Sequence, residues 1–299
     1  MALAAQTTTA AAGSVAAHEL TAEQVARILV KPLEAASVFL AAGPRIFDTA
    51  GPLRIPKAPK ASDVSFVGEN ELIPEVNPDF DEVQLLPSTM KSLKTLTRYS
   101  NELARQSVVA LDAALKDRLV ADVAAKVDAQ FLSASGDGIT TPKGLFAWAG
   151  TQNVAVNGAL TLDHLLTAWG LALSANVNMG SLKWALTPGD FVALRKVKDT
   201  TGQYLLQVDP TVDGVFRLWG APVIVSARIP NTTGASPTGR AALVDFSQIA
   251  VARDAAPSVK VLDQTFGGYD QQAIRVTARY DAAPLNPEAV VTLTGIARS

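Results

Sequence analysis

The sequence predicts an α+β fold, and three observations lead to this prediction. Apolar residues recur every four positions across residues 101–132, which is the pattern of one long amphipathic helix. Before this helix, two extended segments flank an acidic stretch that contains Pro74 and Pro78. After it, short helical and strand patterns alternate to the C-terminus, and the sequence has no internal repeat.

The composition excludes several classes of function. A chain of 299 residues that is 48% hydrophobic and 18% charged can bury one large core or two modest ones. The absence of cysteine excludes disulfides, thiol nucleophiles and cysteine-ligated zinc, and two histidines cannot form a three-histidine metal site. A formal net charge of −2 argues against tight binding of nucleic acid. No apolar run reaches the ~18 residues of a membrane-spanning helix, so we expect no membrane partner.

Residues 1–50 are expected to form an N-terminal arm. The first part of this arm is rich in alanine and threonine and has no basic start, so it does not resemble a secretory signal. A helix pattern begins at Thr21 and ends before Pro32, and a second short helix is expected from Leu33 to Leu40. Such an arm becomes ordered mainly against a partner.

Residues 51–99 are expected to form an extended loop of two strands with an acidic tip. Extended patterns cover residues 53–56, 64–67, 83–86 and 91–99. Seven acids lie from Asp63 to Glu82, and no lysine or arginine occurs between Lys60 and Lys91. A lone two-stranded arm is only marginally stable in water. A solvated acidic loop and an arm that lies on a neighbouring subunit both fit this pattern, and we favour the second.

The helix at residues 101–132 is the strongest element of the sequence. At ~1.5 Å per residue it would be about 45 Å long, well beyond the usual ~11–12 residues of a globular helix. The residues that share its apolar face are Leu111, Leu115, Leu119, Val123, Val127 and Phe131. Gly136 and Gly138 end this segment.

Residues 151–299 combine two short helices with several short strands. The helices are expected at residues 162–175 and 191–197, with Thr187 or Asp190 near the cap of the second. The strands are expected at residues 184–186, 223–225, 241–244, 249–252, 274–281 and 290–296. Apolar and polar residues alternate through the strand at 274–281, which predicts that one of its faces is buried.

A search for catalytic chemistry finds no convincing site. Residues 234–241 have the glycine spacing of a phosphate-binding loop, but Arg240 and Ala241 replace the Lys and Ser/Thr that such a loop needs, so a surface hairpin is the better interpretation. Asp163 and His164 lie at the start of a helix, and no G-x-S-x-G motif supplies a nucleophile. We therefore expect no enzyme activity, no metal site and no cofactor.

Several short stretches form an ordered series along the chain. Gly68-Glu-Asn-Glu-Leu-Ile-Pro, Phe80-Asp-Glu-Val-Gln-Leu-Leu-Pro and Tyr99-Ser-Asn-Glu-Leu come first. The later stretches are Gly136-Asp-Gly, Leu186-Thr-Pro, Lys198-Asp-Thr-Thr-Gly-Gln-Tyr-Leu, Leu218-Trp-Gly-Ala-Pro-Val, Ala242-Leu-Val-Asp-Phe-Ser and Arg279-Tyr-Asp. This series resembles the tailed-bacteriophage major capsid proteins of the Hong Kong 97 fold. Each motif is weak alone, and their order over residues 51–299 carries the resemblance.

The resemblance implies a Hong Kong 97-type capsid fold with four parts. These are an N-terminal arm (residues 1–50), an extended two-stranded loop (51–99), a peripheral domain with a long spine helix (100–150 and 259–285), and an axial domain (151–258 and 286–299). Many copies would form pentamers and hexamers of an icosahedral shell around double-stranded phage DNA, which would be contacted non-specifically. Assembly would occur in the cytoplasm of the bacterial host, with scaffolding, portal and decoration proteins as further partners.

The charged residues of the extended loop are the predicted contacts between subunits. Its acids would pair with basic residues of a neighbouring subunit, and a shell would repeat these individually weak pairs many times. The predicted contact residues are Arg54, Lys57, Lys60, Asp63, Glu69, Glu71, Glu75, Asp79, Asp81, Glu82, Lys91, Lys94 and Arg98.

Two properties of the family receive little support from this sequence. Only residues 1–52 precede the first predicted strand, too few for a built-in scaffolding segment, so a separate scaffolding protein or none is expected. The type member of the family cross-links its chains by a Lys–Asn bond that a Glu assists. Lys57 or Lys60 with Asn286 and Glu288 is the one trio that could do this, but the spacing does not require it.

Two other functions remain alternatives to a phage shell protein. An encapsulin-like bacterial compartment would share the fold but enclose enzyme cargo in place of DNA. A soluble α/β enzyme would use scattered carboxylates and form a small oligomer.

Overall fold

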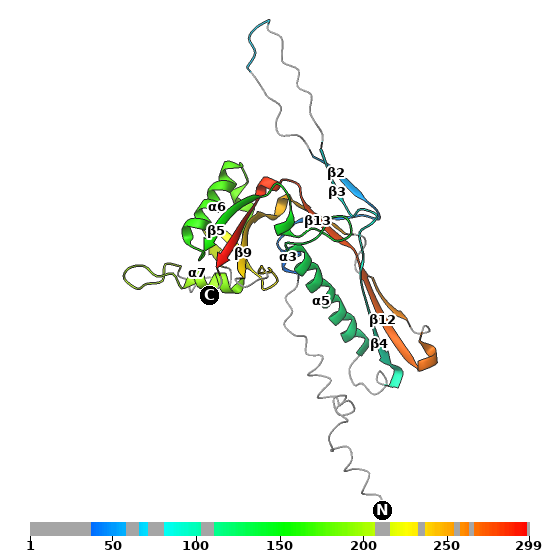
Figure 1. The fold of residues 1–299 in the computed structure, drawn as a ribbon. Helices are drawn as coiled ribbons and strands as arrows, with labels where there is room; N and C mark the ends of the chain where they lie inside the picture. Colours follow the sequence, from blue (N-terminus) through cyan, green and yellow to red (C-terminus); the bar gives the residue numbers. More distant parts are fainter. Residues whose placement is uncertain are drawn as a thin grey trace, which may run out of the picture. The chain divides into compact units, whose positions relative to one another are not determined.

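The computed structural model describes residues 37–57, 66–70, 81–102, 111–206, 216–232, 237–253, 258–262 and 266–297. The chain divides into two compact units (Figure 1). The described part of unit 1 comprises residues 92–102, 111–126, 258–262 and 266–278, and the remaining described residues belong to unit 2. The predicted division into four parts has other boundaries and stays a prediction. The predicted helix at Thr21 lies outside the described residues.

Unit 1 consists of a three-stranded antiparallel sheet and most of one long helix. The sheet has the order β11-β12-β4, with β4 at Leu93–Ser100, β11 at Ser258–Leu262 and β12 at Gln271–Ala278. The 3-10 helix η4 (Gly267–Tyr269) precedes β12. Helix α5 spans Leu111–Phe131, and its part up to Lys126 belongs to this unit, where it runs alongside β4 and β12 (Figure 1).

Helix α5 confirms the predicted long helix. Leu119, Val123, Val127 and Phe131 follow one another at intervals of four residues, and each is at most 7% exposed. The spacing of four therefore marks the buried face, as expected for an amphipathic helix. Asn101 and Glu102 are also helical, and residues 103–110 lie outside the described part of the chain.

The main sheet of unit 2 has six strands in the order β5-β14-β9-β6-β8-β7. β5 is parallel to β14 and β6 is parallel to β8, whereas the other neighbours are antiparallel. The strands are β5 (Gln152–Gly158), β6 (Leu182–Leu186), β7 (Arg217–Leu218), β8 (Ala221–Val225), β9 (Thr238–Asp245) and β14 (Val290–Ala297). Their core contains the fully buried side chains of Leu165, Trp184, Leu243 and Leu293. The predicted strands at residues 184–186, 223–225, 241–244 and 290–296 are thus confirmed.

Both predicted helices of this region are confirmed, with shifted ends. Helix α6 (Leu162–Ser174) packs against β5 and β14 and buries Leu165, Ala168 and Ala172. Helix α7 (Pro188–Arg195) begins three residues earlier than predicted. The reason is local: Thr187 accepts a hydrogen bond from the Asp190 N–H at 3.3 Å, and proline at the first helical position has no N–H to leave unpaired.

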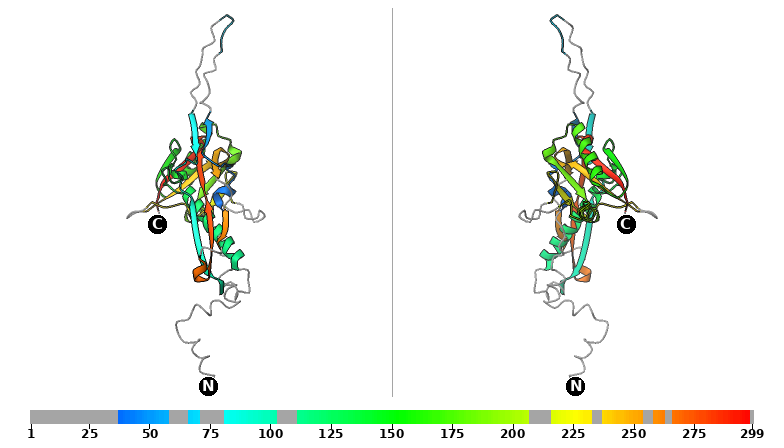
Figure 2. Two further views of the ribbon diagram at one scale, coloured as in Figure 1. Left: turned by 90° about the vertical axis from the view of Figure 1, so that its right-hand side faces the viewer. Right: turned by 90° about the vertical axis from the view of Figure 1, so that its left-hand side faces the viewer.

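A second sheet of unit 2 supports the extended loop. β1 (Arg45–Asp48) is parallel to β10 (Ile249–Arg253), and β10 is antiparallel to β13 (Tyr280–Pro284). The loop itself begins as a separate antiparallel ribbon of β2 (Leu53–Lys57) and β3 (Asp81–Leu85), whose strands lie side by side (Figure 2). The short helix α3 (Val38–Ala41) and the 3-10 helices η1 (Leu145–Ala147), η2 (Met179–Ser181), η3 (Phe246–Gln248) and η5 (Pro287–Ala289) complete the unit.

The prediction of one continuous strand over residues 274–281 is wrong at Arg279. β12 ends at Ala278 and β13 begins at Tyr280, so the alternation of buried and exposed residues changes phase. Ile274 is buried as predicted, but Asp281 is only 4% exposed although the pattern places it outside. The cause is tertiary, because the Asp281 carboxylate accepts backbone N–H groups of Leu86 and Ala282, each at 2.9 Å.

The loop after α5 is built around a carboxylate and two glycines. Asp137 accepts the backbone N–H groups of Ile139, Thr140 and Thr141, which holds the pKa of its carboxyl well below the usual value. Gly136 has a φ of +111°, and a Cβ there would clash with the Pro142 carbonyl oxygen. The predicted end of the helical segment at these glycines is therefore confirmed, with glycine required at Gly136.

Candidate assembly interface

The root of the extended loop is held by hydrophobic packing. The β2–β3 ladder pairs Leu53 with Leu85 and Ile55 with Val83, so these side chains share one face of the ribbon. They pack in one cluster with Leu86, Met90, Ala250, Ala252, Phe47, Ala283 and Leu285. The ribbon thus has the core that an isolated hairpin lacks. The residues that pack against the ribbon come from β1, β10, β13, the residue after β13 and the segment that follows β3, all of unit 2.

The return of the chain from the extended loop is fixed by polar contacts. Leu86 has a positive φ of +50°, which is rare for a bulky residue, and its N–H donates to Asp281. Arg279 Nη2 donates to the Pro87 carbonyl oxygen at 3.4 Å. Further along, the Lys91 N–H donates to the Thr140 carbonyl at 2.9 Å. The loop is therefore anchored on both its apolar and its polar side.

Asp281 is the buried charge of this anchor. Burial raises the pKa of the Asp281 carboxyl to about 6, while the N–H groups of Leu86 and Ala282 act in the opposite direction. No ion pair to Asp281 is present among the described residues. A carboxylate that is buried without a cation is costly, so its role is to satisfy the N–H groups of the turn.

The structure brings together two of the predicted contact residues of the extended loop. Arg54 and Glu82 form an ion pair at 3.3 Å within one chain, with side chains that are 65% and 51% exposed. Such an exposed pair contributes only about 0–1 kcal/mol. Lys57 lies at the end of β2, opposite Asp81 in the ladder, and Glu69 is exposed.

The other predicted contact residues fall into two groups. Lys91, Lys94 and Arg98 are exposed, and the Arg98 guanidinium lies 4.8 Å from the centre of the Phe266 ring. The residues that lie outside the described part of the chain are Lys60, Asp63, Glu71, Glu75 and Asp79. The role of both groups between subunits stays a prediction.

The residues of the predicted cross-link have separate local contacts. Asn286 caps η5, and its side-chain oxygen accepts the Glu288 N–H at 3.1 Å. Lys57 belongs to β2, and Lys60 lies outside the described residues. The cross-link stays a prediction.

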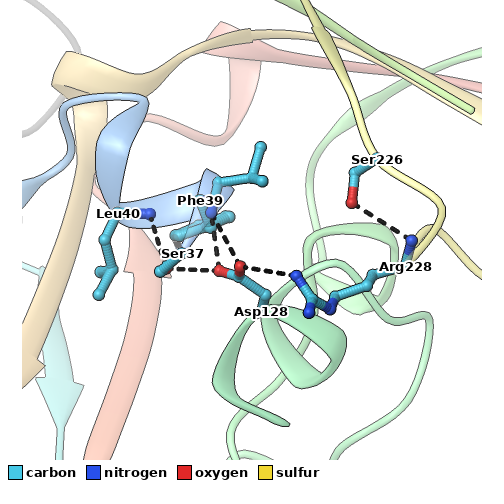
Figure 3. A network of polar contacts seen from close by, with 7 residues as sticks. Ser37, Phe39, Leu40, Asp128, Ser226 and Arg228 are labelled. Carbon is cyan, nitrogen blue, oxygen red and sulfur yellow. Dashed lines mark hydrogen bonds and ion pairs between the residues drawn. The ribbon is translucent and has the colours of Figure 1, made fainter. Parts of the chain in front are cut away.

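A second buried carboxylate anchors the start of the described chain (Figure 3). Asp128 of α5 is fully buried and accepts the Val38 and Phe39 N–H groups, at 2.8 and 3.3 Å, at the start of α3. It also accepts the Ser37 hydroxyl at 2.5 Å and pairs with Arg228 at 3.4 Å. A carboxylate at a helix N-terminus meets unpaired N–H groups and the positive end of the helix dipole. Asp128 therefore fixes the backbone at the start of α3.

The sequence contained a signal for this anchor that was missed. Asp128 directly follows Val127 and precedes Phe131 by three residues, so it lies beside the apolar face of the helix. A charge at such a position is buried only with partners. Phe39, which packs against Phe131 at 5.0 Å between ring centres, brings those partners to it.

The residues considered for catalysis have structural contacts. The His164 ring nitrogen Nδ1 lies 3.3 Å from the Thr161 backbone nitrogen and 2.7 Å from the Thr161 hydroxyl, so it takes part in the cap of α6. Gly239 and Arg240 lie in β9, and residues 233–236 are outside the described chain. In the part that the structure describes, no cluster of three or more histidine or acidic side chains could hold a metal ion. None of the described helices is long and apolar enough to cross a membrane.

Comparison with known proteins decides the family. The sequence profile of the phage capsid family matches residues 19–295. The chain belongs to the phage capsid family. A comparison with curated proteins found no significant match.

Solved capsid structures show the fold of this capsid protein. The chain is similar to the capsid of a native GTA particle, with a TM-score of 0.74 at 18% identity over 90% of this chain and 93% of that one. It is also similar to the structures from Mycobacterium phage Adephagia (TM-score 0.69, 16% identity, 89% and 92% covered) and Gordonia phage Cozz (TM-score 0.68, 16% identity, 90% and 89% covered). The protein has the Hong Kong 97 fold that phage capsid proteins share, as the sequence motifs predicted, and is a component of a capsid shell.

Replacing the loop anchor Asp281 with asparagine is predicted to change how stability depends on pH. The pKa of Asp281 rises from about 3.8 in the unfolded chain to about 6 in the folded protein. The folded state therefore binds more protons between these values, and this group's contribution to the free energy of unfolding falls by up to about 3 kcal/mol as pH rises through that window. Urea denaturation from about pH 4 to about pH 7 should show this fall in the wild type and not in Asp281→Asn.

The matched control for this experiment is Asp137→Asn. The pKa of Asp137 is lowered, so its stabilising contribution is lost only below its unfolded pKa. The free energy of unfolding of Asp137→Asn should therefore change with pH in parallel with that of the wild type above about pH 4.5. Parallel curves for the wild type and Asp281→Asn would contradict the assignment.

Replacing Asp128 with alanine is predicted to lower the free energy of unfolding by about 3 kcal/mol, because Arg228 and the N–H groups of α3 lose a buried partner. Urea denaturation measures this loss. The control is Arg118→Ala, which removes an exposed i,i+4 pair with Asp122 and should cost only about 0.5 kcal/mol. Equal losses in the two variants would refute the anchoring role of Asp128.

Proposed function

We propose that this chain is a major capsid protein that assembles itself into pentamers and hexamers of an icosahedral shell enclosing double-stranded phage DNA. The observation that carries the proposal is the family match over residues 19–295, which includes every described element from α3 to η5 and most of β14. Structural similarity over 90% of the chain to the capsid of a GTA particle supports it, because the likeness extends over the whole fold.

The extended loop is the part of the subunit that is built for contact with a neighbour. Its root is packed and hydrogen-bonded, whereas Phe66 on the loop is completely exposed, with a relative accessibility of 109%. An exposed phenyl ring loses favourable burial, and aromatic side chains are frequent anchors of protein interfaces. Phe66 is therefore the contact that the proposal adds to the charged residues of the loop.

The partners follow from the same proposal. Scaffolding and portal proteins would take part in assembly in the host cytoplasm, a decoration protein could bind the finished shell, and DNA would be held without sequence preference. The net charge of −2 fits a container that encloses DNA without gripping it. Shells with protein cargo and no nuclease-protected DNA would favour an encapsulin-like compartment.

Negative-stain microscopy of the purified protein tests the proposal. Closed shells or capsomer rings are the expected result, and compact particles of a few subunits would overturn it. Boiled particles on a denaturing gel should run as single chains if the shell is held non-covalently. A ladder of chain multiples would instead support the cross-link of Lys57 or Lys60 with Asn286 and Glu288.

Phe66→Ser is predicted to reduce assembly while the fold is kept. The side chain is fully exposed, so the free energy of unfolding should change by less than about 0.5 kcal/mol. Loss of an interface anchor should lower the yield of shells at least about tenfold. Sedimentation measures the yield, and Phe66→Leu is the control that keeps an apolar side chain. Normal assembly of Phe66→Ser would show that this ring is not a contact.

A further inference from the structure

Four cations gather where helix α7 ends. Arg195 is the last residue of α7, Lys196 caps its C-terminus, and Lys198 follows two residues later. Arg217 begins β7, and the residue before it, Phe216, has its ring centre 5.4 Å from the Arg195 guanidinium. The two segments therefore meet at this point. We name Arg195, Lys196, Lys198 and Arg217 the basic cluster.

Aromatic rings hold two of these cations in place. The rings of Phe191 and Phe216 meet edge to face with 4.8 Å between their centres, and the Arg195 guanidinium lies over both. The Lys198 ammonium nitrogen lies 4.8 Å from the centre of the Tyr204 ring. A cation over an aromatic face keeps its N–H groups free to donate hydrogen bonds elsewhere. The basic cluster is therefore positioned in advance of any ligand.

The cations of the basic cluster are accessible and lack an acidic partner within the described chain. Lys196, Lys198 and Arg217 are exposed, and Arg195 is half-buried. None of the four forms an ion pair with a described residue. Arg217 Nη1 donates to the Gly220 carbonyl oxygen at 3.4 Å, which leaves further N–H donors of this guanidinium available.

The two described acids nearest to the basic cluster in the sequence serve a cap and a turn. Asp190 is buried at the start of α7 and accepts the Thr187 hydroxyl at 2.7 Å. Asp199 accepts the Thr201 hydroxyl and the N–H groups of Thr201 and Gln203, and these hydrogen bonds lower the pKa of its carboxyl. Both carboxylates thus stabilise the local backbone, and neither is paired with a cation of the cluster.

The helix dipole accounts for one half of the basic cluster. Arg195 and Lys196 lie at the C-terminus of α7, where a cation is favourable. Lys198 and Arg217 belong to an isolated bridge and to a strand, so the dipole gives no reason for them. Like charges on one surface repel one another, and a surface of one sign attracts ligands of the other sign. The basic cluster therefore indicates an anionic partner from outside the subunit.

We propose that the basic cluster binds the phosphate backbone of the double-stranded DNA that the shell encloses, an inference that rests on the proposed function. Lysine and arginine donate to phosphate oxygens, and such contacts carry no sequence information. Tyr204, which is 51% exposed, adds a hydroxyl that can donate to the same backbone. Each copy of the chain supplies one basic cluster, so many weak contacts would hold DNA of any sequence.

The arrangement of the cations favours DNA over an acidic protein segment as the partner. Duplex DNA carries one negative charge per ~1.7 Å of its axis, so cations at irregular spacing can all find a phosphate. The basic cluster is irregular in this sense, because its members come from a helix end, a bridge and a strand. An acidic peptide would need carboxylates placed to match that spacing, whereas a phosphate backbone needs no such match.

Binding of the full-length chain, kept below the concentration at which it assembles, to a labelled DNA duplex of mixed sequence tests the inference. Fluorescence anisotropy gives the affinity at several salt concentrations. Four phosphate contacts predict that the affinity of the wild type falls about hundredfold between ~50 and ~200 mM salt. The cluster variant, Lys196→Gln with Arg217→Gln, loses two contacts. Its affinity at ~50 mM salt should be at least about tenfold lower, and its salt slope should be smaller by about two.

The matched control is Arg45→Gln with Lys126→Gln, which removes two exposed cations outside the basic cluster. Its net charge equals that of the cluster variant, and its affinity for DNA should stay close to that of the wild type. Equal losses of affinity in the two variants would reflect net charge alone and would overturn the inference. The thermal midpoints of both variants should stay within about 2 °C of the wild type, because the substituted side chains are exposed.

Negative-stain microscopy of the same variants separates this inference from the proposed function. Normal shells of a cluster variant that binds DNA weakly are the expected result. Wild-type affinity of the cluster variant would overturn the inference and leave the proposed function standing. It would show that DNA binds elsewhere or that Asp209 and Asp213, which lie outside the described residues, already neutralise the cluster. Unchanged DNA binding with fewer shells would instead assign the cluster to a contact between subunits. Absence of shells for the wild type would overturn the proposed function itself.

Discussion

Hydrophobic burial at the root of the extended loop is the constraint on which the loop's geometry depends. A ribbon of two strands exposes both faces and cannot hold a fixed direction by its own hydrogen bonds. Here one face is covered: Leu85 is fully buried, and Ile55 and Val83 pack in the same cluster beside β10 and β13. The direction of the ribbon at its root is therefore set by the core of unit 2.

Two buried carboxylates complete the hydrogen bonding at places where regular secondary structure stops. Asp128 serves the free N–H groups at the start of α3, and Asp281 serves the N–H of Leu86, whose positive φ takes it out of the ladder. The two differ in their charge balance. Asp128 has Arg228 beside it, whereas burial without such a cation raises the pKa of Asp281. The same kind of residue thus serves as an anchor with a cation beside it in one place and without a cation in the other.

Local patterns in the sequence predicted much of this fold, and tertiary contacts account for the errors. The buried face of α5 follows from periodicity, and the helix α6 and the two strands at the root of the loop follow from local sequence patterns. The break at Arg279 does not, because the alternation in the sequence continues through it. Asp281 is buried by a contact with Leu86, which lies 195 positions away in the chain. The residues next to Arg279 and Asp281 in the sequence give no sign of a contact with a residue so far away in the chain.

The candidate interface also contains some residues that the sequence alone identifies and others that only the structure identifies. The charge bias of the acidic segment is a property of consecutive residues, so the sequence alone was sufficient to find it. Lys94 and Arg98 were found near it in the chain, whereas the buried anchors Asp128 and Asp281 were missed, because their partners come from segments far away in the chain.

Stability of the subunit and stability of the shell can reside in different surfaces of one chain. Interior packing and the buried carboxylates act within a single copy, whereas the exposed Phe66 ring and the exposed Arg54–Glu82 pair contribute little to the fold of that copy. Exposed groups that contribute little to the single copy and favour contact with a neighbour shift the balance towards assembly without strengthening the fold. Each exposed ion pair contributes only about 0–1 kcal/mol, so a single contact between subunits stays reversible. The number of such contacts then decides whether an assembly of subunits is stable. In the shell we propose, this combination lets misplaced subunits leave during growth and makes the completed particle stable.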